Sequence, residues 1–212
     1  MNKRNLPEKS IRTAFRRLAI LIGVGLAFWV SPASASPARD LVEKFHDNLI
    51  AVMKKADSIN IEQRFVILDP AVRRTFNMPE MIRIASGSVW RTGVDGDKSA
   101  AVAAFTKMSV STYASRFDGF SGQRFETVSE TPGPKNSVVV RTRIHRPGDT
   151  PVKLTYILRQ YSGQWRAFDV IVAGGISELA LRHSEYRAIL KKGGLGALAA
   201  ILNKKSDQIL GR

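Results

Sequence analysis

The sequence predicts a single α+β domain, because the spacing of its apolar residues changes from helical to strand-like and back. Up to about residue 119 they recur every three or four positions, as on one face of a helix. From residue 123 to residue 172 they alternate, and after residue 176 the helical spacing returns. Consecutive strands joined by short turns form an antiparallel sheet. We therefore expect N-terminal helices, a curved antiparallel sheet of four or more strands, and two C-terminal helices against one sheet face, without a linker or an internal repeat.

The first 35 residues have the three parts of a secretory signal peptide. Six basic side chains against the single acid Glu8 precede an apolar run of thirteen residues from Leu18 to Val30, and Ala33-Ser34-Ala35 offers a cleavage site of small residues. An uncleaved membrane anchor is the alternative, but a spanning helix needs roughly 20 apolar residues. We therefore expect cleavage after Ala35 and an exported mature domain, residues 36–212.

The composition restricts the classes of protein to which the mature domain can belong. The chain carries a net charge of +15, and residues 1–35 hold six basic side chains and one acidic one, so the mature domain keeps +10. The absence of cysteine excludes disulfides and a cysteine-linked lipid anchor. In an exported domain, basic residues favour an anionic lipid surface, an acidic protein partner or a solubilising face over nucleic acid. They gather in two groups: Arg141, Arg143, Lys153, Arg159 and Arg166 in the strands, and Lys191, Lys192, Lys204 and Lys205 near the end.

The N-terminal half is predicted to be helical and interrupted by prolines. Ser36 and Pro37 predict the N-cap and first residue of a helix. A second apolar stretch should end at Asp69-Pro70, and Asn77-Met78-Pro79 should break the chain again. The longest internal helix is expected from Asp97 to about Gly119. We interpret its apolar and aromatic stripe as core rather than ligand wall; the stripe consists of Val102, Phe105, Met108, Tyr113 and Phe117.

Four strands are expected after this helix. The first should run from Gln123 to Thr131, followed by a loop from Thr131 to Pro134, and the second from Ser137 to His145. The third starts at Val152, and a tight Ser162-Gly163 hairpin leads into the fourth. In the fourth strand, Phe168, Val170 and Val172 should share one face and Trp165 and Ile171 the other.

The stretch from Gly163 to Leu190 joins the fourth strand to an amphipathic helix. Ser177 is a good N-cap, and Gly193-Gly194 should end this helix, as glycines beyond a helix end commonly do. A further helix is expected to follow. The apolar stripe of the first of these two helices consists of Leu179, His183, Tyr186 and Leu190.

This pattern resembles the MlaC family, the soluble lipid-binding components of the Mla phospholipid-transport system, also called the toluene-tolerance auxiliary family. It is most similar to the hopanoid-associated branch of that family, HpnM. The phospholipid branch has one residue fewer between Asp169 and Ser177, and we expect the additional residue to form a bulge. The matching positions are Gly163, Trp165, Phe168 to Val170, Gly174 to Ser177, Gly193, Gly194 and Leu195 to Leu202.

The resemblance implies that the helices and the curved sheet enclose an apolar cavity. It also implies a periplasmic shuttle that carries a membrane lipid, either a hopanoid or a phospholipid, between membrane-bound components. The implied partners are the lipid, an inner-membrane lipid transporter complex and an outer-membrane component. We expect a monomer without enzymatic activity or cofactor. A register shift of one residue would exchange the side chains that face the cavity with those that face away from it. With the register given above, the predicted lipid-contacting residues are Trp90, Val140, Ile144, Leu154, Tyr156, Phe168, Val170 and Val172.

Two other function classes stay open on the residues alone. One is a pocket enzyme with a layout like that of ketosteroid isomerase, in which Asp169 on a covered strand acts as a base. The other is a non-catalytic adaptor of an envelope complex. For Asp169 we favour a hydrogen bond to backbone or a pair with an arginine. The histidines at 46, 145 and 183 lack the spacing of metal ligands, so we expect no metal site.

Overall fold

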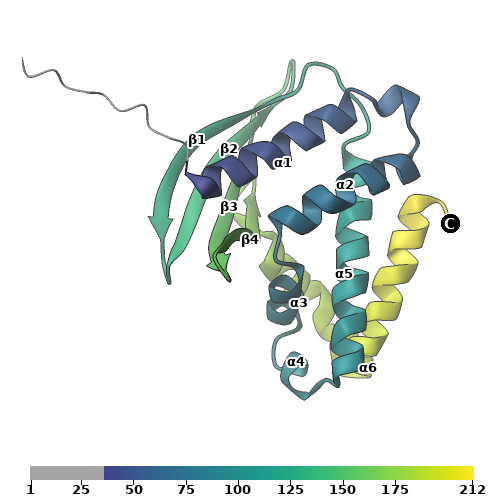
Figure 1. Cartoon of the computed structure of the whole chain (residues 1–212). Coiled ribbons are helices and arrows are strands. Elements are labelled where there is room, and N and C mark those ends of the chain that lie inside the picture. The colour runs from purple at the N-terminus through teal and green to yellow at the C-terminus, as the bar shows by residue number, and fades with distance from the viewer. Residues whose placement is uncertain (1–35) are drawn as a thin grey trace, which may run out of the picture. The chain divides into compact units, whose positions relative to one another are not determined.

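The computed structural model describes residues 36–212, and the expected signal peptide lies outside this range. The described residues fold as an α+β domain, as predicted, with one antiparallel sheet in the order β1-β2-β3-β4-β5. The helices gather on one side of this sheet (Figure 1). The helical elements are α1 (Pro37–Met53), η1 (Ala56–Ser58), α2 (Ile61–Thr75), α3 (Met78–Ser86), α4 (Val89–Thr92), α5 (Asp95–Arg116) and α6 (Glu178–Leu210). The strands are β1 (Arg124–Gly133), β2 (Ser137–His145), β3 (Val152–Tyr161), β4 (Gln164–Val172) and β5 (Ile176–Ser177).

Helix α1 begins as the sequence predicts. The Ser36 hydroxyl accepts a hydrogen bond from the N–H of Arg39 at 3.3 Å, and Pro37 is the first helical residue, where no N–H is needed. The same hydroxyl donates to the Glu130 carboxylate at 2.6 Å and so fastens the helix start to β1. The inward stripe of α1 is fully buried and consists of Val42, Phe45, Leu49 and Val52.

The prediction that Asp69-Pro70 ends the second helix is wrong. Helix α2 continues through Pro70 to Thr75. Because proline has no backbone N–H, the carbonyl group of the residue four positions earlier receives no helical hydrogen bond. Here that residue is Val66, which is 69% exposed, so water can reach its carbonyl group. The predicted break at Asn77 is confirmed, because its side chain accepts a hydrogen bond from the N–H of Glu80 at 3.1 Å and caps α3.

Strand β1 is longer than predicted. It runs beyond Thr131 to Gly133, and Pro132 pairs with Val138 of β2. Because β1 is an edge strand, only one of its sides is hydrogen-bonded, and proline is tolerated there. The expected loop from Thr131 to Pro134 is therefore reduced to a tight turn.

A β-bulge interrupts the alternation of β4. Ala167 pairs with Leu158 of β3, whereas Asp169 pairs with the preceding residue of β3, Ile157. Phe168 is therefore the additional residue on β4. The regular alternation of side chains between the two sheet faces is interrupted at this residue. The inner face of β4 consequently carries Ala167 before the bulge and Val170 after it, both buried.

Because of the bulge, two side chains of β4 lie on the opposite face of the sheet from the one predicted. Phe168 turns to the outer face, where the guanidinium of Arg159 lies 4.7 Å from the centre of its ring. Trp165 turns inward instead and packs against the core. The prediction that Phe168 shares a face with Val170 and Val172 is wrong for this reason.

The additional residue between Asp169 and Ser177 does not form the expected bulge. Strands β4 and β5 make a regular hairpin in which Val172 pairs with Ile176. Ala173-Gly174-Gly175 forms its turn, and both glycines have positive φ, +85° and +84°, which favours glycine there. The bulge of β4 lies at Phe168, one residue before Asp169, and not between Asp169 and Ser177.

Helix α6 bends at Gly194, as the glycine pair predicts. The φ and ψ of Gly194 are 65° and −159°, outside the helical region, so two helical segments meet there. The second segment runs beside α5 (Figure 1). The buried hydroxyls of Ser111 and Ser206 lie 2.6 Å apart, and the Lys107 ammonium lies 2.6 Å from the Asp207 carboxylate. Within residues 36–212, no helix is both long enough and apolar enough to cross a membrane.

Candidate functional site

A cavity of about 490 Å³ lies between the inner face of the sheet and the helices. Its volume is within the range of small-molecule binding sites, roughly 300–1,000 Å³. Helices α1, α3, α5 and the first segment of α6 form its walls, with strands β1 to β4 opposite. Its apolar and aromatic lining consists of Leu49, Met53, Phe76, Met78, Met81, Phe105, Met108, Tyr113, Phe117, Phe125, Ile144, Val152, Leu154, Tyr156, Val170, Val172, Leu179 and Tyr186.

Aromatic rings form one wall of the cavity. The ring of Tyr113 lies 5.9 Å from that of Phe76 and 5.9 Å from that of Phe117, in stacked arrangements, and Phe45 packs edge-on behind them. Burial raises the pKa of Tyr113 well above its ordinary value, so its hydroxyl stays neutral. Four methionines complete the lining, and their flexible thioethers adapt to ligands of different shape.

Five of the eight predicted lipid-contacting residues line this cavity: Ile144, Leu154, Tyr156, Val170 and Val172. The other three lie elsewhere. Val140 is on the inner sheet face but fully buried in the core, and Phe168 faces outward because of the bulge. Trp90 lies on α4 and packs against the core rather than the cavity. Lipid contact by the five lining residues remains a prediction.

The stripe of α5, which we interpreted as core, lines the cavity over most of its length. Phe105, Met108, Tyr113 and Phe117 all border the empty volume, whereas Val102 does not. Periodicity identifies the apolar face of a helix but not whether the space opposite that face is filled. Met53 of α1 and Tyr186 of α6 also line the cavity and were not predicted to, although Tyr186 stands on the apolar stripe predicted for its helix.

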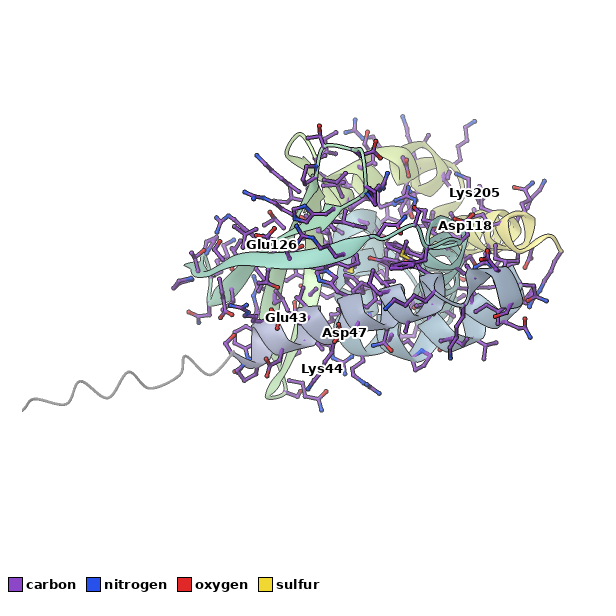
Figure 2. All side chains as sticks on the ribbon, turned by 90° about the horizontal axis from the view of Figure 1, so that it is seen from above. Glu43, Lys44, Asp47, Asp118, Glu126 and Lys205 are labelled. Atoms are coloured by element: carbon purple, nitrogen blue, oxygen red, sulfur yellow. The ribbon has the colours of Figure 1, made fainter. Side chains whose placement is uncertain are left out.

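Charged side chains mark the rim where the cavity meets solvent. Arg116 and Asp118 at the end of α5 and Arg146 after β2 are exposed, yet they border the cavity. Asp118 is seen from above at the end of α5 in Figure 2. On α6, Arg182 forms ion pairs with Glu178 at 3.3 Å and with Glu185 at 2.8 Å. The site therefore combines an apolar interior with a charged rim, as suits an amphipathic ligand.

A buried polar pair lies beside the cavity. Nε2 of His46 is 2.9 Å from the hydroxyl of Tyr156, and the imidazole stacks on Phe125 with the ring centres 3.9 Å apart. Burial lowers the pKa of His46 to about 3, despite the opposing effect of the nearby Glu43 carboxylate. The imidazole is therefore neutral at physiological pH, and this pair brings no charge to the cavity wall.

This burial predicts a pH dependence of stability. Between pH 6.5 and about 3 the unfolded chain binds a proton at His46 and the folded chain does not, so acidification destabilises the fold by up to about 1.4 kcal/mol per pH unit. Urea unfolding of wild type and His46→Gln at a series of pH values measures this effect. The free energy of unfolding of wild type, relative to that of His46→Gln, should decrease as the pH falls through this range. Parallel pH profiles for the two proteins would contradict the prediction.

Asp169 joins the last long strand to the start of α6. Its Oδ1 accepts hydrogen bonds from the N–H groups of Val170 at 2.8 Å and Leu179 at 3.1 Å, and its Oδ2 accepts one from the Ser177 hydroxyl at 2.7 Å. The Ser177 hydroxyl in turn accepts from the N–H of Ala180 at 3.0 Å and caps the helix. The favoured interpretation of Asp169 as a hydrogen-bonding residue is confirmed, and Asp169 does not line the cavity.

The other two histidines also have protein partners. His145 Nε2 is 2.6 Å from the carboxylate of Glu126, and His183 Nδ1 is 3.0 Å from the carbonyl oxygen of Ala85. Across residues 36–212, no three histidine, aspartate or glutamate side chains come together as metal ligands would.

Comparison with known proteins relates this chain to one family. The family model described as MlaC protein matches residues 43–204. A solved structure of the phospholipid-binding protein from Ralstonia solanacearum, in complex with a phospholipid, is similar with a TM-score of 0.71. The match covers 82% of this chain and 99% of that chain at 20% sequence identity, so it demonstrates a shared fold.

Proposed function

The chain belongs to the MlaC family, whose model matches most of its length, and we propose that it is a periplasmic carrier of a membrane lipid. The lipid would occupy the cavity of about 490 Å³ between the sheet and α5. The single observation that carries the proposal is this cavity, which is lined mostly by apolar, aromatic and methionine side chains and has exposed charged groups, such as Arg116 and Arg146, at its border.

The physical requirement for such a carrier is a dry site for hydrocarbon. Exposing apolar surface to water costs about 25 cal/mol per Å², and a lipid chain exposes hundreds of Å². A cavity lined by phenyl rings, thioethers and aliphatic groups removes this cost. The neutral state of the His46–Tyr156 pair keeps the wall compatible with an uncharged chain.

The polar part of the lipid would remain at the rim. Arg116 and Arg146 border the cavity and are exposed, and neither has a carboxylate within 4.0 Å among the residues that the structure describes. Such guanidinium groups can pair with a phosphate. Of the alternatives, a pocket enzyme based on Asp169 is disfavoured because its oxygens already accept three hydrogen bonds outside the cavity.

In this proposal the signal peptide of residues 1–35 is removed and the mature domain works in the periplasm without a cofactor or catalysis. It would receive or deliver its lipid at an inner-membrane transporter complex and at an outer-membrane component, as a monomer. The support is the family membership, the sequence features of a secretory signal and the strongly basic mature chain, for which electrostatic encounter with membrane-bound partners is favourable.

The ligand class is tested by competition. Purified protein is loaded with a fluorescent lipid, and a diacyl phospholipid and a hopanoid are titrated as competitors. Similarity to the hopanoid-associated branch predicts displacement by the hopanoid, whereas the phospholipid-bound fold relative supports displacement by the phospholipid. A preference for phospholipid with no hopanoid binding would exclude the branch assignment and keep the carrier proposal. Failure of the protein to take up the fluorescent lipid, together with failure of both competitors to bind, would overturn the proposed function.

A further inference from the structure

The outer face of the sheet, turned away from the helices, is strongly basic. The four cationic residues of β2 and β3 all occupy outward positions, because the inward positions between them hold buried residues such as Tyr156 and Leu158. Neither strand contains an aspartate or a glutamate. We call this the basic sheet face, and it consists of Arg141, Arg143, Lys153 and Arg159.

The charges on the basic sheet face are balanced only in part within the domain, through Glu126 near Arg143 and Glu80 near Arg159. Arg143 and Lys153 are direct cross-strand partners, an arrangement of like charges that destabilises a sheet. Glu126 on β1 lies opposite Arg143 but is engaged by His145 at 2.6 Å. In residues 36–212, no carboxylate lies within 4.0 Å of any cation of this face. An external anion would therefore relieve repulsion that the fold retains.

The basic sheet face borders the rim of the cavity. Lys153 directly follows Val152, and Arg143 directly precedes Ile144; Val152 and Ile144 line the cavity from the other side of the sheet. Arg146, itself part of the rim, follows in the same turn region. A flat anionic surface that contacted this end of the sheet would lie next to the opening.

We propose that the basic sheet face binds the surface of an anionic lipid bilayer. Protein interfaces are centred on buried aromatic or aliphatic anchors, but none of the large exposed apolar side chains lies on β2 or β3. Arginine and lysine spread over two strands suit a layer of anionic headgroups, whose attraction reaches only about a Debye length, roughly 8 Å at physiological salt. This binding does not use the cavity-lining residues, so it is separable from lipid carriage.

The test is binding of the full mature domain to vesicles, measured by co-sedimentation. Wild type should bind vesicles containing phosphatidylglycerol and not vesicles of phosphatidylcholine alone, and binding should be lost near 1 M salt, where the Debye length is about 3 Å. Reversing three charges with Arg141→Glu, Arg143→Glu and Lys153→Glu should weaken binding about 100-fold or more. The neutral set Arg141→Gln, Arg143→Gln and Lys153→Gln should weaken it in the same direction by a smaller factor.

The matched control removes the same amount of charge elsewhere. Lys192, Lys204 and Lys205 are exposed on α6, and Lys205 is visible there in Figure 2. Replacing these three by Glu should change vesicle binding less than threefold, about 0.6 kcal/mol. Three results would overturn the proposal. The first is an equal loss of vesicle binding in the two sets of variants, and the second is no binding of wild type to phosphatidylglycerol vesicles. The third is binding of the basic sheet face to an acidic protein alone. Native mass spectrometry should detect the same lipid load in every variant, which separates this outcome from a failure of the carrier function.

Discussion

Replacing Leu154 by Asp should abolish lipid binding. Leu154 lines the cavity from near the start of β3, opposite Thr142 and Val172 on the neighbouring strands. A carboxylate there would have to give up water whenever a hydrocarbon chain enters, and burying an unpaired charge costs several kcal/mol. We expect lipid affinity to fall at least about tenfold, which corresponds to about 1.4 kcal/mol. The measurement is titration of the purified variant with a fluorescent lipid.

The control for this change is the next residue along the strand. Thr155 is half-buried on the outer face and pairs with Arg141, so Thr155→Asp adds the same charge on the other side of the sheet. It should bind lipid like wild type. Leu154→Gln, which is polar but uncharged, tests the same wall if Leu154→Asp proves unstable. Lipid binding that survives both Leu154 variants in folded protein would place the ligand outside this cavity.

Replacing Asp169 by Ala should cost stability rather than chemistry. The change removes the acceptor for two backbone N–H groups and one hydroxyl at the junction of β4 and α6, where a carboxylate also lies favourably near a helix N-terminus. An unsatisfied buried polar group costs roughly 1–3 kcal/mol, so the free energy of unfolding should fall by about 3 kcal/mol. Urea unfolding monitored by circular dichroism measures this loss.

The conservative variant separates a structural role from a catalytic one. Asp169→Asn keeps one carbonyl oxygen as an acceptor, so it should lose less stability than Asp169→Ala. Both variants should bind lipid when folded, because Asp169 does not line the cavity. A folded Asp169→Ala with unchanged stability would contradict the account of the junction.

The fold could be predicted from the sequence because its elements carry strong local signals. Ser36-Pro37, Asn77 and Ser177 each begin a helix with a side chain that caps it. The turns of the meander contain glycine or residues that adopt positive φ, and Gly194 bends the last helix. These signals act within a few residues, so no tertiary information is needed to read them.

The details that the sequence did not reveal depend on contacts between distant segments. The bulge at Phe168 is a property of the β3–β4 pairing, and a single extra residue there reversed the facing of two aromatic side chains. Pro70 is tolerated because Val66 lies on the water-facing side of α2, which only the packed fold determines.

The cavity was the hardest feature to predict from pattern. A valine that borders an empty volume and a valine that borders another side chain have the same hydropathy, so Val170 of the cavity and Val140 of the core look alike in sequence. The expectation of a cavity therefore came from the family resemblance, and the structure supplies its walls.

Native mass spectrometry of the mature domain, purified without detergent, tests the lipid-carrier account most directly. The account predicts a complex heavier than the polypeptide by the mass of one membrane lipid, and dissociation in the gas phase should release that lipid for identification. The same measurement on Leu154→Asp should show the polypeptide alone, with Thr155→Asp retaining the adduct. A compact wild-type domain that is consistently free of lipid, and that takes up none when mixed with membrane extract, would contradict the account.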